Sequence, residues 1–92
     1  MPKSARDVMA ALEAKGFRKK ENDHTFFHLW VEGRKTPVYT KVSHGEREIR
    51  DRLLGIMARQ LKLSGKQFRE LIECPLTAAE YIRLLRSGGH IS

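Results

Sequence analysis

Histidines within the segment ENDHTFFHLW, residues 21–30, are the side chains of this sequence best suited to proton transfer at neutral pH. His24 and His28 lie four residues apart in it, and His44 follows further along the chain. Two imidazoles this close first suggest a metal site. On a strand, however, residues four apart lie about 13 Å from each other, too far to share one zinc ion. We therefore expect no metal and no other cofactor at these histidines.

Covalent catalysis by a protein nucleophile has little support in the sequence. The lone Cys74 precedes Pro75, cannot form an internal disulfide and has no C-x-x-C companion for metal or redox chemistry. No serine stands out as the nucleophile of a Ser-His-Asp arrangement. We expect Cys74 to be a buried or neutral thiol.

An RNA substrate asks less of the protein, because RNA brings its own nucleophile, the 2′-hydroxyl. One imidazole can remove that proton and contribute about 10²- to 10⁴-fold to the rate, while a lysine or arginine stabilises charge growing on the phosphate. His24 is the candidate base, His44 a candidate acid, and Lys41 or Lys20 the charge-stabilising group of a metal-independent ribonuclease. The rival interpretation is an inert surface histidine.

Strands must position these side chains, and alternation with a period of two predicts three of them in FRKK, HTFFHLWV and TPVYTKVS. One side of the resulting sheet would face the core. The other, open face would carry basic and aromatic residues, namely Arg18, Lys20, His24, Phe26, His28, Trp30, Tyr39 and Lys41. Cations meet phosphates and rings stack on bases in single-stranded RNA recognition. Arg34 and Lys35, in the second turn, would extend this RNA-binding set.

Turn chemistry predicts the register of the second hairpin. A two-residue loop with Gly33 at its first central position suits a type II′ turn, which would pair Leu29 with Val38. The same register sets His28 opposite Tyr39. Pro37 cannot donate to a ladder, so the third strand should be an edge.

The first hairpin has two registers to choose between. A three-residue loop at 21–23 sets Phe17 opposite Phe27 in the core, and we prefer it. A two-residue loop at 22–23 would instead turn Phe17 outward, exposing a large ring.

Helix starts are predicted wherever a hydroxyl is followed three residues later by an acceptor, because such pairs satisfy free N–H groups at about 1 kcal/mol per cap. Four pairs meet this condition, namely Ser4 with Asp7, Ser43 with Glu46, Ser64 with Gln67, and Thr77 with Glu80. Gly16 would end the first helix. In the second, GEREIRDRLLGIMARQLKL, the buried stripe would be Ile49, Leu53, Ile56 or Met57, and Leu61.

The composition and net charge indicate which classes of partner the protein binds. A chain of 92 residues makes one domain, and 18 Lys and Arg against 11 Asp and Glu give a net charge of +7. Such an excess favours phosphate polyanions or an acidic protein over a merely soluble surface. No apolar run approaches the ~20 residues of a membrane span, and MPKSARDVM does not read as a signal peptide, so we expect a cytoplasmic protein.

The order helix, three strands, helix resembles the HicA family of toxins from bacterial and archaeal toxin–antitoxin pairs, small mRNA interferases with a fold like the double-stranded RNA-binding domain. The motifs are LEAKGF, the histidine of NDHTFF and the histidine of VSHGEREI, within residues 4–62. The chain departs from the family in having Asn22 and Asp23, where Gly-Ser is common, and in a longer C-terminus.

The resemblance implies an α+β fold, with an α-β-β-β-α core over residues 1–62, helices on one face of the sheet, and an extension of two short helices over 63–92. It implies that His24 is catalytic, that His44 has a supporting role, and that a HicB-like antitoxin silences the toxin in a stress-response system. Phe26 and Trp30 could then contact either RNA or antitoxin.

Two rival functions share this fold: a nonenzymatic RNA-binding module and a surface that binds only protein. The C-terminal helices would either enlarge the core or fold back over the open-face rings. His90, in SGGHIS, is expected in a frayed tail.

Overall fold

The computed structural model describes residues 3–73 and 75–92; the prediction for Cys74 lies outside these residues. The fold is α+β, as predicted, with a three-stranded antiparallel sheet in the order β2-β3-β4. A second, two-stranded sheet joins the chain start to the segment before α2. The strands are β1 (Lys3–Ser4), β2 (Phe17–Glu21), β3 (Thr25–Val31), β4 (Arg34–Val42) and β5 (Glu48–Ile49).

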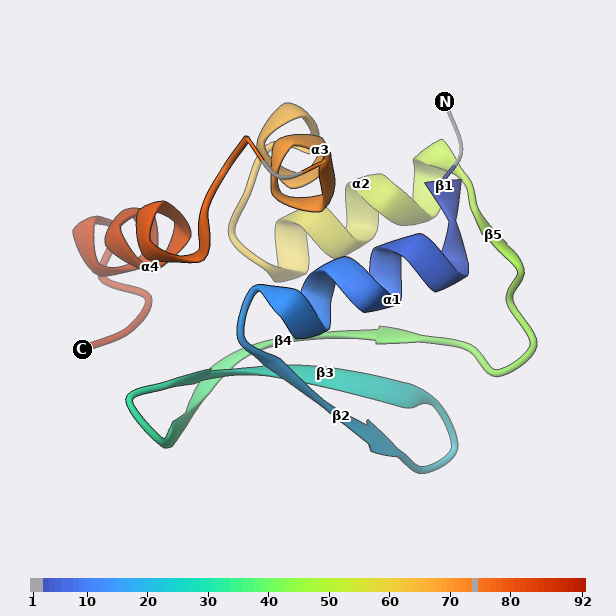
Figure 1. Ribbon diagram of the computed structural model, residues 1–92, viewed down its shortest axis with the longest axis horizontal. Helices are drawn as coiled ribbons and strands as arrows, with labels where there is room; N and C mark the ends of the chain where they lie inside the picture. The colour runs from blue at the N-terminus through green and yellow to red at the C-terminus, as the bar shows by residue number, and fades with distance from the viewer. Residues whose placement is uncertain (1–2, 74) are drawn as a thin grey trace.

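Helices lie on one side of the three-stranded sheet and leave its other face uncovered by any described segment (Figure 1). Over the described ranges they are α1 (Ala5–Ala14), α2 (Asp51–Gln60), α3 (Gly65–Glu73) and α4 (Ala78–Ser87). In this part of the chain no helix is long and apolar enough to cross a membrane.

Three of the four predicted helix starts are confirmed. Ser4 accepts a hydrogen bond from the Asp7 amide (3.4 Å) at the start of α1. α3 follows a reciprocal pair in which the Ser64 hydroxyl accepts from the Gln67 amide (3.1 Å) and the Gln67 side chain accepts from the Ser64 amide (3.0 Å). α4 follows a full capping box at Thr77. These starts were predictable because a cap involves residues only three apart.

The predicted start of the second helix at Ser43 is wrong. α2 begins at Asp51, and the segment before it holds a turn and then the short strand β5, in which the fully buried Ile49 pairs with Lys3 of β1. That partner lies at the other end of the core sequence, so no local pattern indicates it.

The predicted buried stripe is confirmed at Ile49, Met57 and Leu61, but Leu54 is buried in place of Leu53. Leu54, Met57 and Ala58 are buried, whereas Ile56 is 37% exposed and Leu53 only partly buried. Two adjacent leucines allow either stripe, and packing against the sheet and α3 selects the one that contains Leu54.

The second hairpin has the predicted register over most of its length, including His28 opposite Tyr39, and β4 is an edge strand as predicted from Pro37. Its turn is different. Glu32 and Gly33 form the loop with φ of 53° and 76°, the positive values of a type I′ turn, so the predicted II′ turn is wrong.

An irregularity in β4 compensates for that turn, and the predicted pair of Leu29 with Val38 is not part of the ladder. Pro37 has no N–H to donate, and the Thr36 hydroxyl takes over by donating to the Leu29 carbonyl (2.8 Å). The same hydroxyl accepts from the Val38 amide (3.2 Å).

The loop of the first hairpin is 22–24, one residue later than predicted, and Phe17 lies opposite Leu29 instead of Phe27. This register lets the Trp30 amide donate to the Gly16 carbonyl (3.1 Å), which lengthens the ladder. The faces are nevertheless as predicted, since Phe17 is only 3% exposed.

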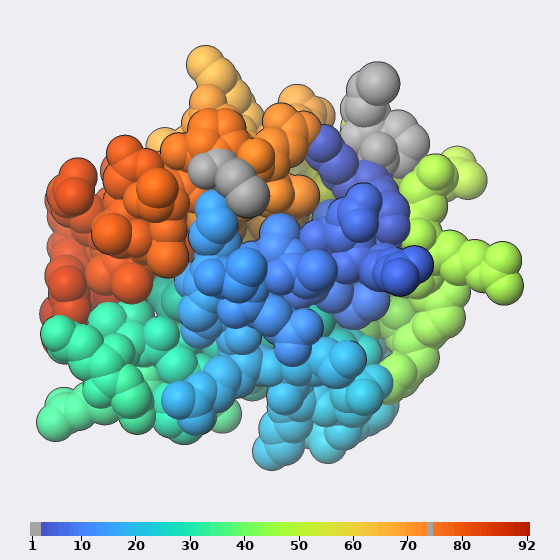
Figure 2. Space-filling view, viewed as in Figure 1, coloured from blue at the N-terminus to red at the C-terminus, as the bar shows by residue number. Residues whose placement is uncertain are grey.

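The C-terminal extension enlarges the core instead of covering the open face. Phe68, Leu71, Tyr81 and Leu85 are all fully buried together with core residues from the helices and sheet. The Tyr81 ring stacks on Phe17 (6.0 Å between centroids). In Figure 2 the orange and red extension lies directly against the rest of the molecule.

Candidate active site and nucleic-acid interface

The open face of the sheet carries a continuous strip of rings. His24 meets Phe26 edge to face (6.4 Å between centroids), Phe26 stacks on His28 (6.2 Å), and His28 stacks on Tyr39 across the strands (5.2 Å). Tyr39 is 44% exposed and the other three rings are partly buried. Contacts between the rings limit their rotamers before any ligand arrives, which lowers the entropic cost of stacking a base on them.

Cations flank this strip on both sides. Lys20 of β2 and Lys41 of β4 both lie opposite Phe26, and the Arg18 guanidinium sits 4.0 Å from the centre of the Trp30 ring. A guanidinium stacked on indole stays charged and keeps N–H donors free at its edge. The predicted grouping of aromatic and basic side chains on one face is therefore confirmed.

His28 is held in its neutral form. Burial, followed by the charges of Lys35 and Lys20, lowers the pKa of its imidazole below the ordinary value. At neutral pH this ring is a stacking surface within the strip instead of a further cation.

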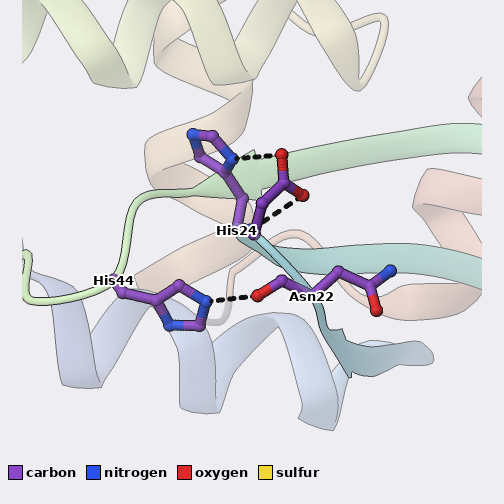
Figure 3. Close-up of polar contacts among 4 residues, drawn as sticks. Asn22, His24 and His44 are labelled. Atoms are coloured by element: carbon purple, nitrogen blue, oxygen red, sulfur yellow. Dashed lines mark hydrogen bonds and ion pairs between the residues drawn. The ribbon is translucent and has the colours of Figure 1, made fainter.

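His24 is the last residue of the 22–24 loop, immediately before β3, and its side chain is 35% exposed. Its Nδ1 is buried and lies 3.4 Å from Oδ2 of Asp23, long for a hydrogen bond, and makes no shorter one within residues 3–73 and 75–92. The other Asp23 oxygen accepts from the His24 amide (3.1 Å; Figure 3). Nε2 is the ring nitrogen that does not face Asp23 (Figure 3).

Asp23, which the sequence shows only as a departure from the family pattern, lies beside the His24 ring. Interaction with the His24 side chain lowers the pKa of the Asp23 carboxyl, so the group is ionised at neutral pH. An ionised carboxylate beside Nδ1 favours the tautomer with the proton on Nδ1 and the lone pair on Nε2.

His44 braces the loop and does not contact His24. Its Nε2 donates to the Asn22 carbonyl (2.8 Å), and its Nδ1 is 3.9 Å from Oε1 of Glu21. Figure 3 shows the two imidazole rings pointing in different directions. His44 thereby ties the 22–24 loop to the chain after β4, a supporting position for the loop that carries His24.

Arg34 and Lys35 lie at the opposite end of β3 from His24, where β4 begins. Lys35 is opposite Trp30, so it lies on the open face. Arg34 and Lys35 both line a cavity next to the hairpin. Within the part of the chain that the structure describes, no cluster of three or more His, Cys, Asp or Glu residues could hold a metal ion.

Comparisons with protein-family models, with curated proteins and with solved structures find no match to this chain.

Proposed function

We propose that this protein is a HicA-like toxin, a metal-independent endoribonuclease that cleaves single-stranded mRNA in the cytoplasm. One observation carries the proposal. His24 has Nδ1 close to an ionised Asp23 and a partly exposed ring, at the end of a strip of rings flanked by cations. A base with a favoured tautomer beside a surface for bases and phosphates suits RNA cleavage by its own 2′-hydroxyl.

The chemistry assigns one step to each group. Nε2 of His24 accepts the proton of the 2′-hydroxyl, the 2′-oxygen attacks the adjacent phosphorus, and the bond from phosphorus to the 5′-oxygen breaks. The products are a 2′,3′-cyclic phosphate and a 5′-hydroxyl, whose proton comes from a general acid or from water. Asp23 stabilises the imidazolium formed, and Lys20 or Lys41 stabilises charge on the phosphate.

Substrate binding would use the rest of the strip. Bases stack on Phe26, His28, Trp30 and Tyr39, while Arg18 and the lysines contact phosphates. Because phosphate contacts release counterions, RNA affinity should fall steeply as salt rises. We further propose that α1, the sheet and α2 are arranged as in a double-stranded RNA-binding domain, with the open face used for a single strand.

Control of such an enzyme requires a partner, and we propose a HicB-like antitoxin that covers the open face and silences cleavage. Support comes from the short motifs around His24 and His44. A neighbouring reading frame that encodes a small HicB-like protein, and that relieves toxicity when co-expressed, is the expected finding.

Induced expression in cells tests the toxin proposal. Wild type should arrest growth and degrade mRNA, and His24→Ala should do neither while remaining folded. His28→Ala is the comparison variant, since it removes a stacking imidazole from the same strip without touching the base: it should weaken RNA binding and still cleave the RNA that is bound. Equal toxicity of wild type and His24→Ala would remove His24 from the mechanism.

A nonenzymatic RNA-binding module is the second candidate, and the stacking of His28 on Tyr39 favours it independently of His24. In that case wild type binds RNA with a strong salt dependence and leaves it intact. Absence of RNA binding altogether would favour a surface that contacts only protein.

A further inference from the structure

A cavity of about 810 Å³ lies between the β3–β4 hairpin and the segment that follows α4. Arg34 and Lys35 line it from the hairpin, and Arg86 and His90 line it from the C-terminal side. Figure 1 shows α4 and the C-terminus above the hairpin, and in Figure 2 the same two regions face each other at the left edge. We call this cavity the hairpin pocket.

The C-terminal wall of the hairpin pocket is a defined structure, not the frayed tail that SGGHIS suggested. Gly89 has a φ of 74°, and the His90 amide donates back to the Leu85 carbonyl (2.9 Å), as in a Schellman helix end. Ile91 then packs partly buried against the core. A left-handed glycine and an apolar anchor therefore fix the position of His90 on the pocket wall.

Charge in the hairpin pocket favours an anion. The cationic side chains of Arg34, Lys35 and Arg86 line it beside one acidic side chain, that of Glu32, and the main-chain end at Ser92. Arg86 bridges the two walls, with Nη2 3.7 Å from Oε2 of Glu32 and Nε donating to the Ser92 carbonyl (3.0 Å). The Glu32 side chain is 84% exposed, so this ion pair is weak and a phosphate can replace it. Guanidinium groups bind phosphate oxygens in a bidentate geometry.

The hairpin pocket lies on the helix side of the hairpin and the strip of rings on the open face, and Lys35 links the two. Lys35 lines the pocket, lies opposite Trp30, and its positive charge acts on His28. From His24 to Val31 the chain advances seven residues, which corresponds to about 23 Å along an extended strand. A strand of RNA with one phosphate at His24 that crosses the rings would reach Lys35 at the far end of the sheet and turn around the hairpin there to enter the pocket.

We propose that the hairpin pocket is a second phosphate subsite for the RNA strand cleaved at His24. It holds a backbone phosphate about four nucleotides from the scissile bond, at the lower end of the site sizes of single-strand-binding domains. This inference rests on the proposed function and gives the C-terminal extension a role in substrate binding through Arg86 and His90.

The test measures binding of RNA that cannot be cleaved, made of 2′-O-methyl nucleotides in lengths of about two, four and six residues. Fluorescence anisotropy compares wild type with Arg86→Ala and with Arg83→Ala, an exposed arginine of α4 outside the pocket lining. For the longest RNA, Arg86→Ala should weaken binding about ten-fold and lower the salt slope by about one, with no effect on the shortest. Arg83→Ala should bind all lengths as wild type does.

Glu32→Gln should change RNA affinity in the opposite direction. Removing the carboxylate that pairs with Arg86 should tighten binding of the longest RNA, a result that a merely structural role for the ion pair does not produce. Should Arg86→Ala fail to fold, Arg34→Ala tests the pocket from the hairpin wall. Identical affinities for the pocket variants, Arg83→Ala and wild type overturn the inference.

Cleavage assays separate this inference from the proposed function. If wild type cleaves RNA and the pocket variants bind every length normally, the nuclease stands and the subsite fails. If the length and Arg86 effects appear while wild type leaves cleavable RNA intact, the subsite stands and the nuclease fails.

Discussion

Replacing Tyr39 with alanine isolates the stacking contribution of the open face. Tyr39 is 44% exposed and its described contacts are with the rings of His28 (5.2 Å) and Phe26 (6.3 Å), so the change leaves the core intact. Stacking of one base on one aromatic ring contributes about 1–3 kcal/mol. Loss of that ring should therefore weaken RNA binding about 5- to 150-fold, since 1.4 kcal/mol corresponds to a factor of ten.

Anisotropy titrations with a short single-stranded RNA at several salt concentrations measure this effect. Tyrosine carries no charge, so Tyr39→Ala should lower affinity at every salt concentration and leave the salt slope unchanged, whereas Lys20→Ala should reduce the slope by about one. Tyr39→Phe, which keeps the ring, should bind as wild type does. Leu84→Ala is the matched control, because Leu84 is 41% exposed on the C-terminal extension. Unchanged affinity of Tyr39→Ala would refute stacking at this position.

Three further predictions concern the base, the strip and the extension. Asp23→Ala should slow cleavage about ten-fold, well below the ~10⁴-fold effect of a buried orienting aspartate, because the Asp23 side chain is 81% exposed. Nitrogen NMR of this variant should show that His24 loses its preference for the proton on Nδ1. An unchanged tautomer would contradict the assignment. Because the pKa of His28 is lowered in the folded state, the unfolded state takes up the proton at a higher pH, and the free energy of unfolding falls as the pH drops below about 6.5. Thermal unfolding of His28→Asn should therefore depend less on pH than that of wild type. An equal pH dependence in the two proteins would exclude this linkage. Lys15 is buried and donates to the carbonyls of Leu71 (3.0 Å) and Leu76 (2.5 Å). Lys15→Met should therefore lower the free energy of unfolding in urea by about 2–4 kcal/mol. Lys19→Met, at an exposed lysine, is the control, and an equal loss of stability in both variants would contradict the prediction.

Features that depend on local chemistry could be predicted from the sequence. The caps at Ser64 and Thr77 involve residues three apart, and alternation along β3 assigned Phe26 and Trp30 to the open face and Phe27 to the core. The faces of the sheet were predicted correctly in spite of the wrong register in the first hairpin. Moving the loop by one residue changed the partner of Phe17 by two positions, which leaves its side chain on the same face.

Features that depend on distant partners could not be predicted. The local pattern places Ile49 in a helix, and only its pairing with β1 makes it part of a strand. The II′ turn was predicted without the hydrogen bond that the Thr36 hydroxyl makes where Pro37 cannot donate one. His90 reads as a tail residue because its position depends on a left-handed Gly89 and on packing of Ile91.

The most direct test of the catalytic proposal uses purified protein, a labelled single-stranded RNA and excess chelator. Wild type should cut the RNA and leave 2′,3′-cyclic phosphate ends, and His24→Ala, folded and still binding the RNA, should lose at least about 10²-fold in rate. Cleavage by the variant at the wild-type rate, or dependence of the wild-type reaction on added metal, would contradict the account.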